Sequence, residues 1–313
     1  MHELELIEAL EQTFAAGRNS RVVHGLGDDA AVVRARPYAV TSVDGMVDGV
    51  HFRSEWLGPE QIGHRALAAA LSDIAAMGAD VGEAYLFLGL PGGTDPELAR
   101  GIANGAQALA ARHGVSILGG DVTRAPALIV SFTVTGWAED PGELVSRAGA
   151  RAGDQVVVTG ALGAAGAGLA LTDGSATVRP GVDGAALRTA YATPEPRLEA
   201  GRDLAQAGAT AMIDISDGIA TDAGHLARRS GVEIELTLAS LPLAPSVAEV
   251  AEQLGVQAGA FAATAGEDFE LCACLPRGIS VPGTTVVGRV LEGSPGLRFS
   301  DSSEPLAGFE HAL

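Results

Sequence analysis

The chain of 313 residues contains no lysine, so all 20 of its basic residues are arginine. A Walker P-loop places a lysine beside the nucleotide phosphates, protein kinases carry one on a strand, and Schiff-base enzymes use its amine. The sequence excludes all three classes. If the protein handles nucleotide phosphates, then metal ions, arginine and main-chain N–H groups must balance the phosphate charge.

Cysteine and long apolar runs are also scarce. Cys272 and Cys274 alternate in an apparent strand and are poorly placed to bond each other, which predicts buried thiols. No apolar run reaches the ~20 residues that cross a bilayer, and the first residues are acidic where a secretory signal is basic. We therefore expect a cytoplasmic protein without a membrane partner.

Basic residues are also few relative to acidic ones. The chain has 39 acidic residues against 20 basic ones, which gives a formal net charge of -19 at pH 7. This balance repels a phosphate-rich polymer, and no local basic patch in the sequence offsets it. We therefore predict that nucleic acid is not a partner.

Runs typical of strands alternate with segments of helical spacing. Strand-like runs occupy 38–43, 85–90, 115–118 and 127–137, and apolar residues recur at helical spacing over 59–79 and 95–113. Residues 138–153 are polar and rich in glycine, which is typical of a boundary between domains, and a second series of elements follows. The pattern predicts an α/β (α+β) protein with two domains, residues 1–138 and 139–313.

Aspartate is concentrated in five short segments, at 27–29, 42–44, 71–73, 119–121 and 214–217. An isolated buried carboxylate is costly, so these residues either face solvent or share cations. Mg²⁺ fits the second alternative, because it prefers carboxylate oxygen, water and substrate phosphate. Alone, the segments at 27–29, 42–44, 119–121 and 214–217 also fit a plain turn or cap, and Asp73 fits a solvated residue on a helix. Asp44 and Asp121 are both expected at the ends of strands.

The segment MIDISDG at 212–218 alternates so that Asp214 and Ser216 share one face of a strand. Ser216 or Asp217 then begins the next helix. Serine and aspartate are routine helix caps, whereas a helix N-terminus also favours a bound phosphate, with Asp217 as a metal ligand beside it. The residues alone leave both alternatives open.

Two other features invite a binding role. The glycine-rich segment at 159–168 has no true G-x-G-x-x-G followed by an acidic residue at the expected distance, so close packing of a helix on a strand explains it better than a dinucleotide site. His51 has no second histidine or cysteine at zinc spacing. A hydrogen bond to a substrate and a purely structural role both remain open for His51.

Taken in order, several segments resemble the motif series of the thiamine-monophosphate kinases. They are GLGDDAAVV, SVDGMVDGVHF, ALSDIAAMGAD, LGGDVTRAP, SRAGARAGDQVVVTG, MIDISDGIATDAGHLARRSG and AGEDFELC. The resemblance extends from Gly25 to the C-terminal GFEHAL. Aminoimidazole ribonucleotide synthetases, selenophosphate synthetases and hydrogenase-maturation dehydratases share the fold and some aspartates, but not the combination of DGVHF, SDIAAMGAD, GGDVTRAP and GEDFEL.

The resemblance implies a two-domain fold similar to aminoimidazole ribonucleotide synthetase, with the N-terminal sheet paired across a homodimer and the C-terminal domain covering the nucleotide. It also implies roles by motif position. The magnesium ligands would be Asp29, Ser42, Asp44, Asp73, Asp121, Asp214 and Asp217. Gly120, Asp121, Arg147 and Ser216 would contact ATP, and His51, Glu267 and Phe309 would contact thiamine monophosphate.

The implied reaction is phosphorylation of thiamine monophosphate to thiamine diphosphate by ATP, through direct in-line transfer with several Mg²⁺ ions. Asp44, Asp121 and Asp217 would act closest to the chemistry. One alternative is another ATP-using enzyme of the same fold, such as aminoimidazole ribonucleotide synthetase. The other is a catalytically silent nucleotide-binding relative, against which the complete set of aspartates argues.

Overall fold

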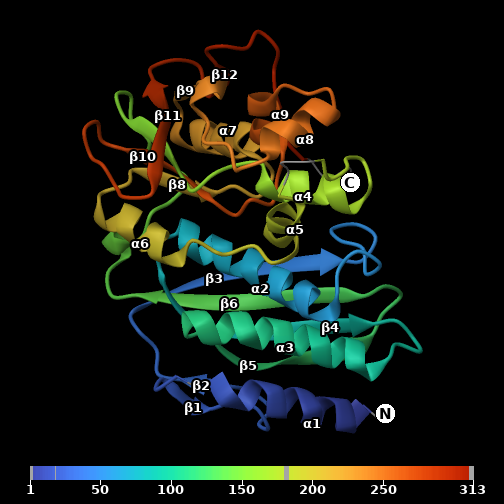
Figure 1. Cartoon of the computed structure of the whole chain (residues 1–313). Coiled ribbons are helices and arrows are strands. Elements are labelled where there is room, and N and C mark those ends of the chain that lie inside the picture. The colour runs from blue at the N-terminus through green and yellow to red at the C-terminus, as the bar shows by residue number, and fades with distance from the viewer. Residues whose placement is uncertain (1–2, 18, 180–182, 310–313) are drawn as a thin grey trace. The chain divides into compact units, whose positions relative to one another are not determined.

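The computed structural model describes residues 3–17, 19–179 and 183–309, and the chain divides into two compact units. Unit 1 comprises Met1–Ile74 and Ala79–Pro141, and unit 2 comprises Ala75–Gly78 and Gly142–Leu313. The main division between them falls within the polar, glycine-rich stretch that follows residue 138. Both units mix helices with sheets, as the α/β (α+β) prediction requires (Figure 1).

Unit 1 contains a four-stranded sheet, the two-stranded sheet β1-β2, and the α-helices α1, α2 and α3. Its elements are α1 (Glu3–Phe14), η1 (Ala15–Gly17), β1 (Val22–His24), β2 (Val32–Val33), β3 (Tyr38–Val47), α2 (Pro59–Ala76), β4 (Asp80–Leu90), α3 (Pro96–His113), β5 (Ser116–Arg124) and β6 (Ile129–Ala138). Helix α3 shows how local sequence sets its ends. Asp95 caps it by accepting the N–H of Glu97, and Gly114 ends it in a left-handed conformation.

The four-stranded sheet of unit 1 has the order β3-β6-β4-β5. Strand β6 therefore lies inside the sheet, with β3 on one side and β4 on the other, and its Val130, Phe132 and Val134 are buried. The apolar run 129–134 is therefore paired on both sides within the sheet. The edges of this sheet are β3 and β5, so the 129–134 strand is not available to pair with the sheet of a second copy.

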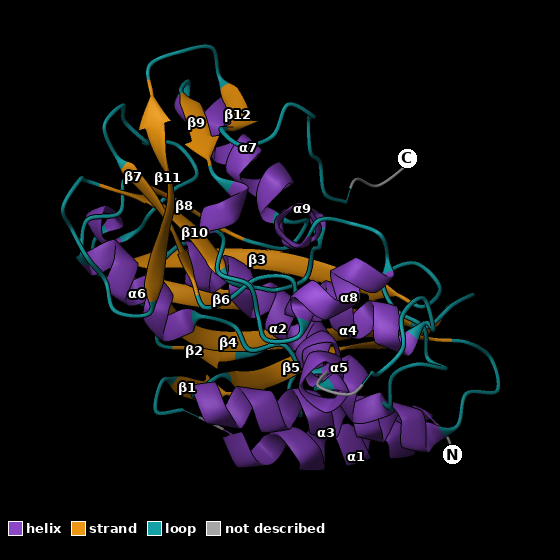
Figure 2. Cartoon of the chain, turned by 45° about the horizontal axis from the view of Figure 1, so that its top comes forward, coloured by secondary structure: helices purple, strands orange, loops and turns teal. Residues whose placement is uncertain are grey.

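One face of this sheet is covered and the other is open. Helices α2 and α3 lie side by side over the first face (Figures 1 and 2). Register places Val43 on the opposite face beside Thr133 and Tyr85, with Phe87 two residues further along β4. Val43 is 67% exposed and Phe87 is 36% exposed, so this open face carries apolar side chains.

Unit 2 contains a larger mixed sheet. Its elements after η2 (Pro141–Glu143) are β7 (Gln155–Thr159), α4 (Ala164–Thr172), α5 (Gly184–Ala192), α6 (Leu198–Gln206), β8 (Ala211–Asp214), α7 (Ile219–Ser230), β9 (Glu233–Leu236), η3 (Leu238–Ser240), α8 (Val247–Gln253), α9 (Ala258–Thr264), β10 (Leu271–Leu275), β11 (Thr284–Leu291) and β12 (Gly296–Phe299). The strand order is β12-β9-β11-β7-β10-β8, with β12 parallel to β9 and the other pairs antiparallel.

The core of unit 2 lies between this sheet and helix α7. Every residue of β10 is buried, including Cys272 and Cys274, and both cysteines are free thiols as predicted. Helix α7 packs against β8, β9 and β12 through Ile219, Ala223 and Leu226 (Figure 2). Burial raises the pKa of the Cys274 thiol to about 12, so this thiol stays protonated at neutral pH.

Several short elements were not predicted. Helices α5, α8 and α9 have nine residues or fewer, so each shows too few turns for a clear periodicity. Over the ranges that the structure describes, no helix is both long enough and apolar enough to cross a membrane.

Candidate functional site

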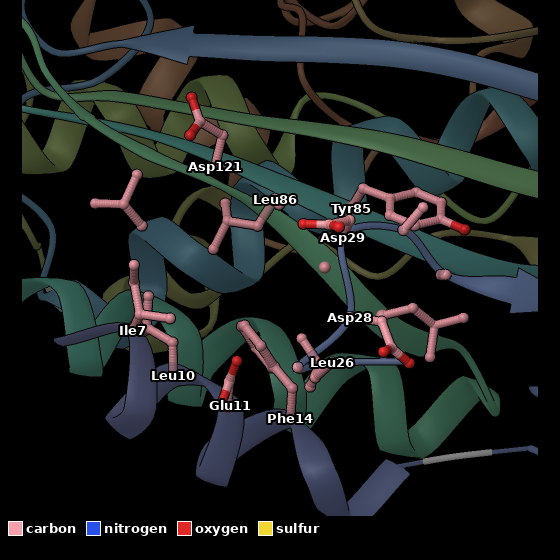
Figure 3. Close-up of a pocket in the computed structure, with 17 residues that line it drawn as sticks. Ile7, Leu10, Glu11, Phe14, Leu26, Asp28, Asp29, Tyr85, Leu86 and Asp121 are labelled. Carbon is pink, nitrogen blue, oxygen red and sulfur yellow. The ribbon is translucent and has the colours of Figure 1, made fainter. Parts of the chain in front are cut away.

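A cavity of about 860 Å³ in unit 1 brings together three of the predicted residues, Asp29, Gly120 and Asp121. We name it the β5 pocket. Its walls are α1, the segment between β1 and β2, and the facing parts of β4 and β5; the lining residues are Ile7, Leu10, Glu11, Phe14, Leu26, Gly27, Asp28, Asp29, Ala30, Ala31, Tyr85, Leu86, Leu118, Gly119, Gly120, Asp121 and Val122. The carboxylates of Asp29 and Asp121 lie on the side of the pocket away from α1 (Figure 3).

The pocket has an apolar wall and an acidic edge. Leu10 and Phe14 of α1 supply apolar surface, whereas Asp28, Asp29 and Asp121 are exposed carboxylates. An apolar wall suits a flat organic ring, and carboxylates need cations before they can approach a phosphate. The pocket therefore has the chemistry for a ligand that is partly aromatic and partly bound through metal ions.

Gly120 and Asp121 do not lie at the end of a strand, which corrects the prediction. Strand β5 continues to Arg124 because it pairs in parallel with β4 as far as Leu90. A Cβ atom on Gly120 would lie 1.8 Å from the carbonyl oxygen of Leu86, so glycine is required for the two strands to pair. The close pairing of β5 with β4 therefore explains why residue 120 is glycine. Gly120 also lines the β5 pocket.

A second group of predicted residues, the β3 cluster, comprises Ser42, Asp44 and Asp73. The hydroxyl of Ser42 donates a hydrogen bond of 2.5 Å to Oδ2 of Asp73 on α2. Asp44 lies two residues further along the same face of β3, and its Oδ1 accepts the N–H of Gly45. All three side chains are half-buried oxygen donors, which are the ligands that Mg²⁺ prefers.

Asp44 also lies within its strand rather than at the end. Pairing with β6 carries β3 on to Val47, and the hydroxyl of Ser131 donates to the carbonyl oxygen of Asp44. His51 follows in the next turn, where its Nδ1 accepts the N–H of Val47 at 3.1 Å. A neutral His51 ring in this arrangement carries its proton on Nε2, which makes that nitrogen a hydrogen-bond donor.

The two groups of unit 1 cannot share one ion within the unit. Asp44 and Asp121 are on β3 and β5, the opposite edges of a four-stranded sheet. Three strand spacings separate them, or about 14 Å. Across residues 3–17, 19–179 and 183–309, no three His, Cys, Asp or Glu side chains form a group that could hold a metal ion. Within one copy of unit 1, Asp44 and Asp121 therefore cannot bind the same ion.

In unit 2, three segments that are far apart in sequence converge on the loop between β8 and α7. We name this place the α7 loop site; its segments are 214–218, 266–269 and 308–309. Phe309 N–H donates to the carbonyl oxygen of Asp217 at 3.0 Å, and Glu267 N–H donates to that of Ser216 at 2.7 Å. The predicted residues Asp214, Ser216, Asp217, Glu267 and Phe309 thus meet at one place.

The loop itself differs from the prediction in two ways. Strand β8 ends at Asp214, so Ser216 lies beyond it and does not share a strand face with Asp214. Helix α7 begins only at Ile219, and its N-cap is Gly218 rather than Ser216 or Asp217. The plain helix-cap interpretation is therefore wrong for both residues. They remain half-buried in a loop that other segments hold in place.

Asp222 is a buried member of this site that the sequence analysis missed. Its Oδ2 accepts the N–H of Asp217 at 3.1 Å. Burial, together with the negative charges of Asp214 and Asp217, raises the pKa of Asp222 to about 8. The signal in the sequence was an aspartate in the first turn of a helix, which is common and carries little information.

Basic side chains lie towards the C-terminal end of α7, the helix that follows this loop. Arg228 Nη2 lies 3.1 Å from Nδ1 of His225 on α7. Burial and the charges of Arg228 and Arg147 lower the pKa of His225, while the charge of Asp217 acts in the opposite direction. Arg147 and Asp217 both act on His225, but the carbonyl oxygen of Arg147 accepts the hydroxyl of Ser230 at the C-terminal end of α7, away from the α7 loop.

The glycine-rich segment is not a dinucleotide site. Asp268 occupies the start of α4, where its Oδ2 accepts the N–H of Gly163 at 2.7 Å and its Oδ1 accepts that of Ala165 at 3.1 Å. A pyrophosphate would need those same N–H groups. The prediction that this segment serves packing agrees with the structure.

Comparisons with known proteins identify the family. Residues 27–138 match the N-terminal domain of AIR synthase related proteins, and residues 151–294 match the C-terminal domain. Thiamine-monophosphate kinase from Mycobacterium tuberculosis is 36% identical over 274 residues, which cover 87% of this chain and 80% of the relative. The Escherichia coli K12 enzyme of the same name is 33% identical, with 94% of each chain covered.

This chain belongs to the thiamine-monophosphate kinase family.

Solved structures of the family agree with this assignment. Thiamine-monophosphate kinase from Stenotrophomonas maltophilia K279a matches with a TM-score of 0.83 and 31% identity, covering 97% of this chain and 98% of that one. AaThiL complexed with AMPPCP and TMP matches with a TM-score of 0.79 and 30% identity, covering 97% and 96%. Hydrogenase maturation protein HypE in complex with ATP is 18% identical with a TM-score of 0.75, which shows a shared fold alone. The fold, family and enzyme class expected from the motifs are confirmed.

Proposed function

We propose that this protein phosphorylates thiamine monophosphate to thiamine diphosphate with ATP, by direct in-line transfer. An oxygen of the substrate phosphate attacks the γ-phosphorus of ATP, the bond to the bridging oxygen breaks, and ADP leaves. A phosphate is already largely ionised near neutral pH, so a strong general base is not needed. Positioning and charge neutralisation then supply most of the rate.

One observation carries the proposal. The similarity to AaThiL complexed with AMPPCP and TMP, an ATP analogue and a second ligand, extends over 97% of this chain. Predicted site residues from distant parts of the sequence also gather at the β5 pocket, the β3 cluster and the α7 loop site. Such gathering is what a binding site requires and what isolated turns or caps would not produce.

The aspartates are suitable ligands for the Mg²⁺ ions that would accompany ATP. Ser42, Asp44 and Asp73 of the β3 cluster, Asp29 and Asp121 of the β5 pocket, and Asp214 and Asp217 of the α7 loop would hold several ions. All of these donors are hard oxygen atoms, and one Mg²⁺ uses only one or two carboxylates. When bound, the ions would neutralise negative charge on the polyphosphate. Asp44, Asp121 and Asp217 are the residues that we place closest to the transferred group.

Other residues would bind the organic parts of the substrates. Gly120, Arg147 and Ser216 would join Asp121 in contacting ATP, and Arg147 supplies the positive charge that lysine gives in other kinases. Thiamine carries a fixed positive charge, which Glu267 would attract and the ring of Phe309 would face. His51 would donate from Nε2 to the substrate phosphate.

We further propose a cytoplasmic homodimer that pairs through the open sheet face of unit 1. Val43 and Phe87 expose apolar surface there, and such surface marks an interaction site when it is continuous. A Val43→Glu variant should sediment as a monomer at micromolar concentration. Val50→Glu, at a loop valine that is 62% exposed, should stay dimeric. A wild-type monomer would reject the proposal.

A coupled assay tests the function directly. The purified protein should form ADP and thiamine diphosphate when thiamine monophosphate and ATP are both present. Formylglycinamidine ribonucleotide, the acceptor used in aminoimidazole ribonucleotide synthesis, should not support ADP formation. Turnover with that acceptor alone would favour the other enzyme of this fold. ATP binding without turnover of either acceptor would favour a silent relative.

A further inference from the structure

The turn at Glu267 has an unusual main-chain conformation. Glu267 has a φ of 66° and Phe269 a φ of 49°, so two residues with side chains adopt the left-handed region on either side of Asp268. Such conformations are costly for residues other than glycine and persist only where surrounding structure enforces them. Contacts from the α7 loop and from the start of α4 surround this turn.

Main-chain contacts hold one side of the turn. The N–H groups of Glu267 and Phe269 donate to the carbonyl oxygens of Ser216 and Ile215, at 2.7 and 3.0 Å. A Cβ atom on Gly266 would lie 2.5 Å from the Ser216 oxygen, so only glycine allows the two segments this close. The turn is thereby fixed to the loop that carries Asp217.

Asp268 holds the other side. Gly163, the N-cap residue of α4, has no side chain with which to cap the helix, and the Asp268 carboxylate accepts the first N–H groups in its place. These bonds connect residues more than a hundred positions apart. The carboxylate therefore fixes its own residue to α4, midway between the two left-handed residues.

The following residues are fixed as well. Glu270 forms two hydrogen bonds with Arg197, at 2.8 and 2.6 Å, and accepts one from the Thr159 hydroxyl at 2.6 Å. The acidic side chains of residues 267–270 therefore fall into two groups. Asp268 and Glu270 are bound to the body of unit 2, while Glu267 is the acidic residue beside the α7 loop.

We propose that Asp268 is a positioning residue for substrate recognition, which holds Glu267 in its left-handed turn by capping α4. This inference rests on the proposed function, because it takes Glu267 as the carboxylate that attracts the thiamine cation. Asp268 acts through Glu267 and does not itself touch the substrate. Loss of its carboxylate lets the turn relax to an ordinary conformation and moves Glu267 away from the cation.

The test compares Asp268→Asn with Asp301→Asn in the full chain. Asp301 is a matched control, because its carboxylate also accepts two main-chain N–H groups, from Leu238 and Ala239, elsewhere in unit 2. Misplacement of a binding group by about 1 Å costs up to about a hundredfold. We expect Asp268→Asn to raise the KM for thiamine monophosphate about tenfold with little change in that for ATP. Asp301→Asn should change neither.

A double variant distinguishes positioning from general structural damage. If Asp268 acts through Glu267, then Glu267→Gln/Asp268→Asn should have the same KM for thiamine monophosphate as Glu267→Gln alone. Additive effects of the two substitutions would overturn the proposal. If Asp268→Asn does not fold, Ala165→Pro removes one of the two donors while proline remains tolerable in a first helical turn. A KM unchanged in that variant would also overturn the proposal.

Hydrogen exchange provides a measurement that does not depend on the enzyme's substrate. The amide hydrogens of Glu267 and Phe269 should exchange at least about tenfold faster in Asp268→Asn, while those of β10 stay unchanged. Equal exchange in wild type and variant would reject the positioning role even if the kinase activity is confirmed. Faster exchange in a protein that does not turn over thiamine monophosphate would support positioning and reject the proposed function instead.

Discussion

The main-chain N–H of Phe309 donates a hydrogen bond of 3.0 Å to the carbonyl oxygen of Asp217. Next to it, Gly308 N–H donates to the hydroxyl of Thr221 at 2.8 Å, and a Cβ atom on Gly308 would lie 1.7 Å from the same Asp217 oxygen. The described end of the chain is thus bound to the loop that carries the predicted metal ligand. Phe309 itself is 53% exposed, which leaves its ring accessible to a ligand.

Deleting residues 308–313 should therefore weaken binding of thiamine monophosphate more than binding of ATP. Loss of a cation–π contact and its burial costs roughly 1 to 2 kcal/mol, or about a five- to thirtyfold increase in KM. The matched control deletes only 310–313, which lie outside the described residues, and keeps both hydrogen bonds. Steady-state kinetics of the two truncated proteins give the comparison. An equal KM in wild type and the longer deletion would remove Phe309 from the site.

Removal of Mg²⁺ should abolish turnover. Oxygen ligands that leave several waters in place bind this ion only moderately, so we expect a requirement in the millimolar range. Turnover should disappear with a chelator and return when Mg²⁺ is added in excess. The ion should also raise the midpoint of thermal unfolding, because it binds only the folded protein. Full activity after exhaustive removal of metal would contradict this prediction.

Asp121→Asn should lose turnover and keep its stability. Asp121 is exposed in the β5 pocket, and a cluster of carboxylates without metal repels itself, so loss of one charge need not destabilise the fold. Asp95→Ala is the opposite control, because loss of the α3 cap should cost about 1 kcal/mol of stability without changing kcat. Urea unfolding and the coupled assay measure both quantities. If Asp121→Asn unfolds instead, the residue is structural. Asp44→Asn should likewise keep its fold and lose turnover.

The stability of the metal-free protein should depend on pH through Asp268. Burial is the main cause that raises the pKa of Asp268, to about 7 against an ordinary value of 3.8, although its N–H partners oppose the shift. Because the pKa of Asp268 is higher in the folded than in the unfolded protein, protonated Asp268 stabilises the fold fully below pH 4. This stabilisation is lost as the pH rises through 7. The free energy of unfolding of wild type relative to Asp268→Asn should fall over this range, by at most about 1.4 kcal/mol per pH unit.

Asp301→Asn is the control for this pH experiment. Burial of Asp301 acts to raise its pKa, but the N–H groups of Ala239 and Leu238 outweigh it, and the pKa is lowered overall. Its contribution is therefore present above about pH 4 and is lost only in stronger acid. The difference between wild type and Asp301→Asn should stay flat between pH 5 and 8. A flat difference for Asp268→Asn as well would show that Asp268 ionises normally.

The sequence predicted those helices and strands well whose start, periodicity and end are all marked within one short stretch. Helix α3 was expected over 95–113 and begins at Pro96 after the Asp95 cap, because cap, periodicity and terminal glycine all occur in one short stretch. Strand ends were predicted less well. Gly45 and Gly119 suggested ends for β3 and β5, but pairing with β6 and β4 carries both strands further. Tertiary pairing overrides a single glycine, and the sequence does not display the partner.

The identification of site residues from the sequence was limited in the same way. Asp29, Asp73, Asp121 and Glu267 were identifiable because each occurs in a motif of the family. Asp222 was not identified as a member of the site. Asp268 was not identified as a positioning residue, because the N–H donors that define its role lie at Gly163 and Ala165. Only folding brings a carboxylate to a helix start so distant in sequence.

The strand order of unit 2 also has a consequence for the order in which the protein is made. Every pairing among the described strands of its sheet includes β10, β11 or β12, so β7, β8 and β9 have no sheet partner until the residues from Leu271 onwards leave the ribosome. Unit 1, whose sheet pairs within residues 38–138, is complete long before. During synthesis, the first half of unit 2 therefore emerges with buried-type strands still unpaired, and it is the stage at which a nascent chain most needs protection from aggregation.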